Sequence, residues 1–74
     1  MDIRKNEITG GQCCVFQKNG EYFYADRSFT FDAGMETMIF PYDKEIEEVS
    51  DWGDLYCDRT GKSLKECIEE FLSW

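Results

Sequence analysis

Histidine is absent from the 74-residue sequence, which removes the usual general base and the commonest nitrogen ligand of zinc. Long apolar runs are absent as well. No stretch reaches the roughly 18 apolar residues of a membrane span or the about 7–15 of a secretory signal. We therefore expect a cytoplasmic protein that is not an enzyme and has no membrane segment. In that compartment cysteines are reduced thiols or metal ligands rather than disulfides.

Positive charge is scarce beyond residue 30. Residues 1–30 carry four acids and four bases, whereas residues 31–74 carry twelve acids and four bases, which accounts for the whole net charge of −8. The densest acidic stretch is 43–58, where Lys44 is the only base. Such a field repels nucleic acid and attracts basic protein surfaces. The alternative is that the charge only keeps the protein in solution.

The composition is nevertheless that of a folded domain. Hydrophobic residues make up 42% of the chain and aromatic residues 16%, more than a disordered acidic tail carries. A chain this short forms one domain, residues 1–74, with a modest core that buries only about 60% of the unfolded surface.

A β-hairpin is predicted over residues 12–26. The strand 12–17 is followed by Asn19-Gly20, the strongest short hairpin signal, and residues 21–26 form the return strand. A two-residue turn fixes the register and so divides the side chains between two faces. The face assigned to the core carries Cys14, Phe16, Phe23 and Ala25. The partly exposed face carries Cys13, Val15, Tyr22 and Tyr24.

The middle of the chain is expected to be less regular. Residues 28–32 are predicted as a connector or edge strand, and 34–40 as a third strand that Pro41 ends or places at an edge. Residues 41–51 are predicted as a charged loop with a helical turn around 44–49. Alternation predicts a short strand over 54–58, with Leu55 and Cys57 facing inward and Tyr56 facing outward.

An amphipathic helix is predicted over residues 64–73. Ser63 and Glu66 form a capping-box pattern at its start. The apolar stripe that follows has helical spacing and consists of Leu64, Cys67, Ile68, Phe71 and Leu72. The expected fold is therefore α+β, a small antiparallel β-sheet of three to four strands with one C-terminal amphipathic helix packed on it.

The four cysteines allow two interpretations. Cys14, Cys57 and Cys67 are all predicted to face the core, where a structural zinc could join them with Cys13 or a carboxylate as the fourth ligand. However, the chain lacks the usual Cys-x2-Cys spacing, and adjacent strand residues such as Cys13 and Cys14 point to opposite faces. Buried free thiols are therefore favoured, and the expected cofactor is none or one structural zinc.

The candidate partner-binding residues combine acids of the 43–58 stretch and of the outer helix face with one tryptophan between acids. Exposed aromatic side chains are frequent interface anchors, and Trp52 is the strongest candidate among them. The complete set is Asp43, Glu45, Glu47, Glu48, Asp51, Trp52, Asp54, Asp58, Glu66, Glu69 and Glu70.

One segment carries a family resemblance. Residues 36–41 (Glu-Thr-Met-Ile-Phe-Pro), with Asp51-Trp52, Leu55 and Asp58-Arg59 after them, resemble a pattern of small acidic phage- and prophage-borne proteins of Firmicutes. The match covers about residues 34–74 and leaves out the N-terminal hairpin. The chain departs from the pattern after Arg59, where Thr60-Gly61 replaces the usual tyrosine.

By type, the chain also resembles the anti-CRISPR inhibitors. That resemblance implies a phage-encoded inhibitor in the cytoplasm of a bacterial host. Its carboxylates would pair with Arg and Lys on a basic surface of a Cas9-type nuclease and block nucleic-acid loading, without contacting nucleic acid or membrane. The alternative function is an accessory or structural module, zinc-stapled or dimeric, whose charge serves only solubility.

Overall fold

The computed structural model describes every residue, Met1–Trp74. Its elements are β1 (Arg4–Lys5), β2 (Gln12–Lys18), β3 (Glu21–Thr30), β4 (Gly34–Asp43), β5 (Glu48–Val49), β6 (Tyr56–Asp58) and α1 (Leu64–Leu72). Strands β1 to β5 are neighbours in chain order, and β6 pairs with β4. All pairs are antiparallel. The α+β class is thus correct, but the sheet has six strands rather than three to four.

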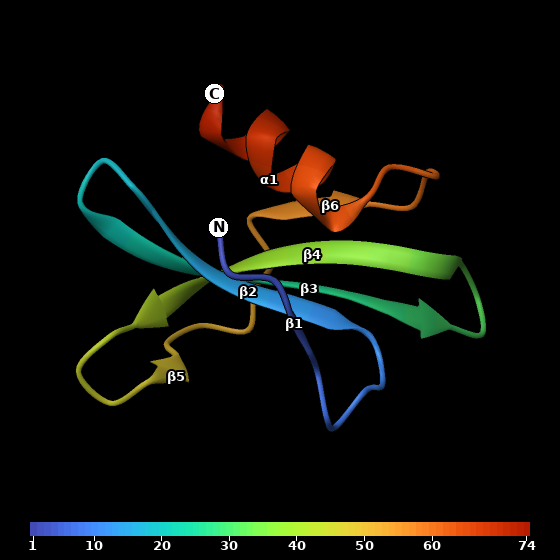
Figure 1. Ribbon diagram of the computed structural model, residues 1–74, viewed down its shortest axis with the longest axis horizontal. Helices are drawn as coiled ribbons and strands as arrows, with labels where there is room; N and C mark the ends of the chain where they lie inside the picture. Colours follow the sequence, from blue (N-terminus) through green and yellow to red (C-terminus); the bar gives the residue numbers. More distant parts are fainter.

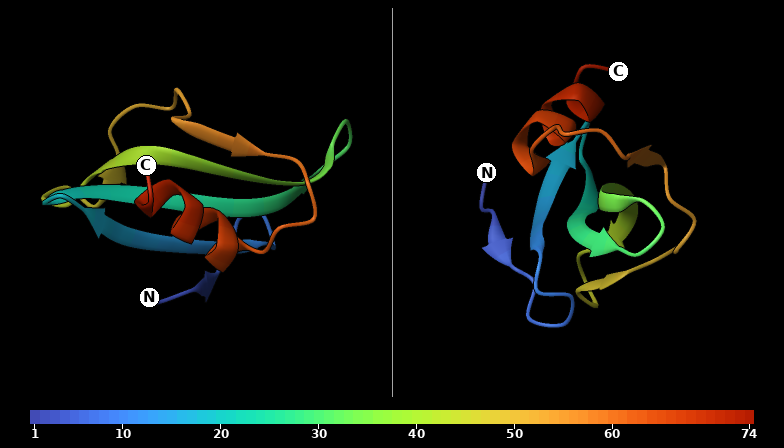
Figure 2. Two further views of the ribbon diagram at one scale, coloured as in Figure 1. Left: turned by 90° about the horizontal axis from the view of Figure 1, so that it is seen from above. Right: turned by 90° about the vertical axis from the view of Figure 1, so that its right-hand side faces the viewer.

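The twisted sheet curves into a half-barrel with the helix on one side only. Figure 1 shows α1 above the long strands, and β5 and the β1–β2 loop below them. In the right-hand view of Figure 2, the β1–β2 loop and the chain that follows β5 lie at the end away from the helix. The helix therefore covers one face of the sheet, and the opposite face is covered only in part, by the β1–β2 loop and the segment after β5.

The β2–β3 hairpin has the register that its turn predicts. Asn19 and Gly20 both have positive φ, 52° and 81°, as a two-residue type I′ turn requires. Cys14 is paired with Ala25, and the register continues to Phe16 and Phe23 next to the turn. Cys14, Phe23 and Ala25 are buried and Phe16 is half-buried against them, so the predicted core face is confirmed. Cys13, on the face where partial exposure is predicted, is buried as well.

Strands β3 and β4 are longer than expected. Residues 28–30 belong to β3, which pairs with β4 as far as Thr30 and Gly34. β4 continues through Pro41, the last β4 residue that pairs with β3. The carbonyl of Pro41 accepts from the N–H of Ser50, on the side away from β3. Its ring nitrogen faces that same side, so the missing N–H leaves no gap in the β3–β4 ladder.

The helical turn expected around 44–49 is wrong. The segment is a β-hairpin in which Tyr42 pairs with Val49 and Asp43 with Glu48. Asp43 Oδ1 accepts from the N–H of Glu45 at 2.9 Å and so starts the turn. Glu47 has a φ of 55°, which allows the chain to reverse direction and enter β5. A carboxylate side chain therefore occupies a position where glycine or asparagine is usual.

The orientation expected for residues 54–58 is also wrong. β6 pairs with β4 so that Tyr56 lies opposite Ile39 and Cys57 opposite Met38. Since Ile39 is fully buried, Tyr56 shares its face and enters the core. Alternation then turns Cys57 outward, and Leu55 is 49% exposed. A run of three strand residues has too little periodicity to decide this orientation without knowledge of its partner strand.

Helix α1 closes the core as predicted. Ser63 accepts from the N–H of Glu66, whose carboxylate accepts from the Ser63 N–H, so the capping box is present. Leu72 is 39% exposed and lies at the edge of the apolar stripe. Strands and helix share one core, made of Cys14, Phe23, Ala25, Ile39, Tyr56, Leu64, Cys67, Ile68 and Phe71.

Lys18 connects the β2–β3 hairpin to the end of the helix. Its Nζ donates to the carbonyl oxygens of Phe71 at 2.9 Å and Trp74 at 3.1 Å. The same ammonium lies 4.9 Å from the centre of the Phe71 ring. A cation at this position also interacts favourably with the negative end of the helix dipole.

The chain contains no helix with the length and apolar character that crossing a membrane demands.

Replacing Ser63 by alanine should lower the free energy of unfolding by about 1 kcal/mol, because the N–H of Glu66 loses its acceptor. Ser63→Asp keeps an acceptor and is the matched control.

Hydrogen bonds from Ser63 also hold the pKa of Glu66 below its usual value. The Glu66 carboxylate therefore stabilises the fold above about pH 4, and this contribution is lost as pH falls further.

Urea titrations monitored by circular dichroism check both expectations. Between neutral pH and roughly pH 3 the unmodified protein should lose more stability than Glu66→Gln, which caps the helix at every pH. Equal losses in the two proteins would show that the Glu66 carboxylate does not couple to folding.

Candidate functional site

The structure divides the predicted partner-binding residues between two sides of the sheet. The members in the 43–54 stretch lie on the β4–β5 hairpin and on the segment that follows it. Glu66, Glu69 and Glu70 lie on α1, which Figure 1 shows on the opposite side of the sheet. Asp58 ends β6 and lies beside the start of the helix, with Oδ2 3.8 Å from the Cys67 sulfur. These acids therefore do not form one continuous surface.

Several of these carboxylates hold local structure. Asp51 Oδ1 accepts from the N–H of Gly53 at 2.8 Å, and Asp58 accepts from the N–H and hydroxyl of Thr60. Glu66 caps the helix, and Glu70 pairs with Lys62. The remaining ion pairs join Asp2 to Arg4 and Glu36 to Arg59. The acids left without a cationic partner include Glu45, Glu47, Glu48, Asp54 and Glu69.

Aromatic side chains line a hollow together with two of the unpaired acids, Glu47 and Glu48. Tyr24 on β3 and Tyr42 on β4 are stacked, with ring centroids 6.3 Å apart. Trp52 is 70% exposed and meets Phe40 edge-on at 5.1 Å. A hollow of about 340 Å³ lies among these side chains. We call its lining the acidic–aromatic face: Tyr24, Tyr42, Glu47, Glu48, Val49 and Trp52.

A second hollow adjoins the acidic–aromatic face. It measures about 220 Å³ and shares Tyr24 and Trp52 with the first hollow. Its remaining walls come from the β1–β2 loop and from the centres of β3 and β4. We call it the slot, and its lining is Asn6, Ile8, Thr9, Tyr24, Asp26, Met38, Phe40 and Trp52.

Sequence reasoning missed the residues of the slot other than Tyr24 and Trp52. A period-two pattern does place Tyr22, Tyr24 and Asp26 on one face of β3. The register that brings Phe40 opposite Tyr24 and Met38 opposite Asp26 is set by the β3–β4 turn, which has no strong sequence signal. The loop residues Asn6 and Ile8 have no pattern that predicts where they lie.

The cysteines do not converge. Cys14 and Cys67 are fully buried in the core, Cys57 is exposed, and Cys13 lies on the opposite face of β2 from Cys14. No group of three or more His, Cys, Asp or Glu residues is arranged to hold a metal ion. The convergence on which the zinc prediction depended is therefore not formed, because Cys57 faces away from the core. All four thiols are free, and burial raises the pKa of Cys14.

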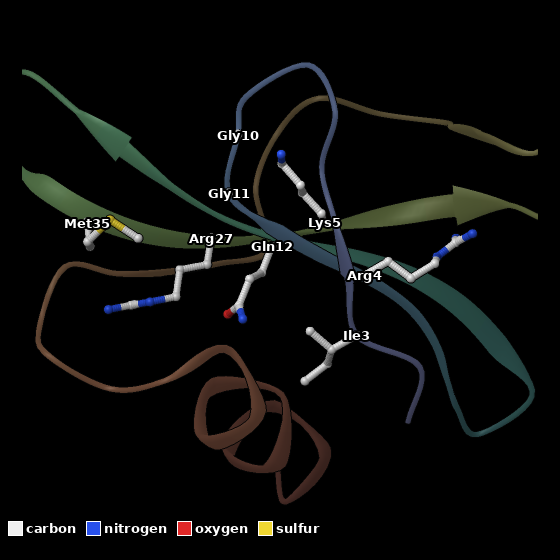
Figure 3. A pocket seen from close by; sticks show the side chains of 8 residues that line it. All are labelled: Ile3, Arg4, Lys5, Gly10, Gly11, Gln12, Arg27 and Met35. Atoms are coloured by element: carbon white, nitrogen blue, oxygen red, sulfur yellow. The ribbon is translucent and has the colours of Figure 1, made fainter.

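A third hollow, of about 440 Å³, lies beside β1 and contains much of the positive charge of the N-terminal half. Arg27 donates to Thr37 Oγ1 at 3.0 Å, which fixes its direction along the sheet. Figure 3 shows Arg4, Lys5 and Arg27 pointing in different directions from this hollow. Their charges do not meet at one point, so the hollow has no built site for an anion.

Comparison with protein-family models, with curated proteins and with solved structures yields no match for this chain. The features that point to a function lie on the face of the sheet away from α1. That face combines unpaired carboxylates, exposed aromatic rings and two adjoining hollows.

Proposed function

We propose that this protein is a phage-borne, non-enzymatic inhibitor that binds a basic surface of a host protein through the acidic–aromatic face. The observation that supports this most is the position of Glu47 and Glu48, which border a hollow beside the exposed Trp52 and have no cationic partner. Tryptophan, tyrosine and arginine are enriched among the residues that contribute most to binding in protein interfaces, and such residues tend to contact one another across the interface. The surface thus suits a partner rich in Arg and Lys.

The specific partner that we propose is a Cas9-type nuclease. Its guide and target channels hold phosphates with Arg and Lys, and carboxylates on a rigid sheet can take the place of those phosphates. The net charge of −8 steers the protein towards such a channel and away from nucleic acid itself. The complex would then block nucleic-acid loading and weaken as salt concentration rises.

The backbone of Glu47 gives a second argument. A non-glycine residue in the left-handed region costs roughly 1–2 kcal/mol, and glycine would remove that cost. The chain instead has a glutamate with a φ of 55° at the rim of the hollow. Backbone strain of this kind is found mainly at functional sites, where the role of the side chain outweighs the loss of folding stability.

Glu47→Gly should therefore stabilise the fold by about 1 kcal/mol and at the same time weaken partner binding at least about tenfold. Glu48→Lys should weaken binding further, whereas Glu69→Lys makes the same change of charge on the helix side and should leave the affinity within about twofold. The measurement is the affinity of a purified Cas9-type nuclease without guide RNA, by biolayer interferometry at two salt concentrations. Urea titration of each variant measures stability separately.

Three results would count against the proposal. Equal losses for Glu48→Lys and Glu69→Lys would show that general charge, not the acidic–aromatic face, drives binding. If Glu47→Gly binds with unchanged affinity, the hollow is not part of the interface. No binding to the nuclease would eliminate that partner, and metal analysis with light scattering would then test the zinc-stapled or dimeric alternative.

A further inference from the structure

Asp26 is a partly buried carboxylate without a counter-ion. Its Oδ1 accepts from Asn6 Nδ2 at 2.8 Å and its Oδ2 accepts from the Ser28 hydroxyl at 3.0 Å. The ion pairs of the protein are all formed by other acids. A carboxylate has about four lone-pair sites, so both oxygens keep accepting capacity that these two neutral donors do not use. A charge taken partly out of water in this way favours a cationic partner.

The slot that contains Asp26 has the size of a side-chain site. Its volume of about 220 Å³ is below the roughly 300–1,000 Å³ of small-molecule pockets. Its rim is apolar and open, since Ile8 is 96% exposed and Trp52 is 70% exposed. Asn6 fixes the loop that forms one wall, because it donates to Tyr24 Oη at 3.0 Å and accepts from the N–H of Ile8 at 3.0 Å.

The chemistry of the walls selects the occupant. An apolar side chain would cover Asp26 and leave its charge unpaired, and an acidic side chain would be repelled. Guanidinium is planar, stacks on tryptophan and tyrosine, and bonds carboxylates with two parallel donors. A lysine ammonium is more strongly hydrated and has no flat face to stack.

We propose that the slot binds one arginine side chain of the partner, with the guanidinium on Asp26 and the stem between Ile8 and Trp52. The inference rests on the proposed function, and it names the residue that this surface recognises. Glu47 and Glu48 lie on the adjoining hollow, which shares Tyr24 and Trp52 with the slot. They add negative potential outside the slot, while Asp26 provides the specific contact inside it.

The test uses short peptides and needs no knowledge of the partner. Acetyl-Gly-Arg-Gly-amide is titrated into ¹⁵N-labelled protein, along with the same peptide carrying lysine or citrulline, the neutral isostere of arginine. The indole N–H of Trp52 and the side-chain amide of Asn6 should shift with the arginine peptide. The lysine peptide should bind at least about threefold more weakly and the citrulline peptide at least about tenfold more weakly.

Asp26→Asn should weaken the arginine peptide about tenfold, whereas Asp32→Asn, the same loss of charge on the exposed β3–β4 turn, should have little effect. Equal binding of arginine and citrulline would overturn the proposal without any variant, and so would equal effects of Asp26→Asn and Asp32→Asn. Failure of the proposed function would look different. The arginine peptide would still bind at the slot, while Glu48→Lys would leave the affinity for the nuclease unchanged.

Discussion

Phe71→Ala is expected to lower the free energy of unfolding by about 3–5 kcal/mol, the range for an aromatic residue removed from a core. Phe71 contacts the rings of Phe16, Phe23, Tyr56 and Trp74, with centroids 5.1–6.3 Å away. It is therefore the aromatic side chain that joins α1 to the β2–β3 hairpin and to β6. A domain of this length has about 4–11 kcal/mol of stability in total, so the variant should lose a large part of it.

The neighbouring residue provides the control. Leu72 lies on the same helix turn and is 39% exposed, so Leu72→Ala should cost about 1 kcal/mol or less. Urea unfolding monitored by circular dichroism and by tryptophan fluorescence measures both variants. If Phe71→Ala lowers the free energy of unfolding no more than Leu72→Ala does, the helix is not a necessary part of the core.

Gly11→Ala is expected to cost about 2–3 kcal/mol, because the added methyl group has no room. A Cβ at Gly11 would overlap the carbonyl oxygen of Arg27 and lie 3.0 Å from the Cα of Ser28. These atoms belong to the backbone of β3, a central strand that cannot move aside. The β1–β2 loop must therefore lift away from β3.

This variant should also affect the slot. The lifted loop carries Asn6 and Ile8, so Gly11→Ala should abolish the shift of the Trp52 indole on addition of the arginine peptide. Gly61→Ala is the matched control, since a Cβ there meets nothing within 4 Å and the change should stay within about 0.5 kcal/mol. If Gly11→Ala has the same stability and the same peptide binding as Gly61→Ala, the close contact between the loop and β3 is contradicted.

Local signals in the sequence were sufficient for two parts of the fold. Asn19-Gly20 determines both the turn and the register of the β2–β3 hairpin, because the type I′ turn accepts few other residues. Ser63 and Glu66 mark the start of α1, and the helical spacing of its apolar residues identifies the buried face. In each case the information lies within a few residues along the chain.

The errors concern how segments pair, both across the sheet and within the short β4–β5 hairpin. The inward position of Tyr56 follows from its pairing with Ile39, and nothing in residues 54–58 contains that information. The charge of residues 41–51 predicts a loop, but a short edge hairpin tolerates charge because its side chains remain in water. Pro41 is expected either to end a strand or to lie at an edge; β4 continues past it because its carbonyl and ring nitrogen face the side of β4 away from β3.

The candidate site was predictable only in part. Acidic residues around Trp52 indicate the β4–β5 segment, and the structure places Glu47, Glu48 and Trp52 around one hollow. Charge alone does not distinguish these acids from Glu66, Glu69 and Glu70, which lie on the helix on the other side of the sheet. The importance of Asp26 depends on what surrounds it, and the partners Asn6 and Ser28 become visible only once the strands are paired.

The contacts of Lys18 have a consequence for how the chain is made. Lys18 Nζ reaches the carbonyl of Phe71, which is 53 residues later in the sequence. During translation the β2–β3 hairpin therefore emerges long before the helix that covers Phe16 and Phe23. Sheets closed by such distant contacts fold in milliseconds to seconds rather than microseconds. Until Phe71 has left the ribosome, Phe16 and Phe23 therefore lack the ring that covers them, and the nascent hairpin is exposed to aggregation.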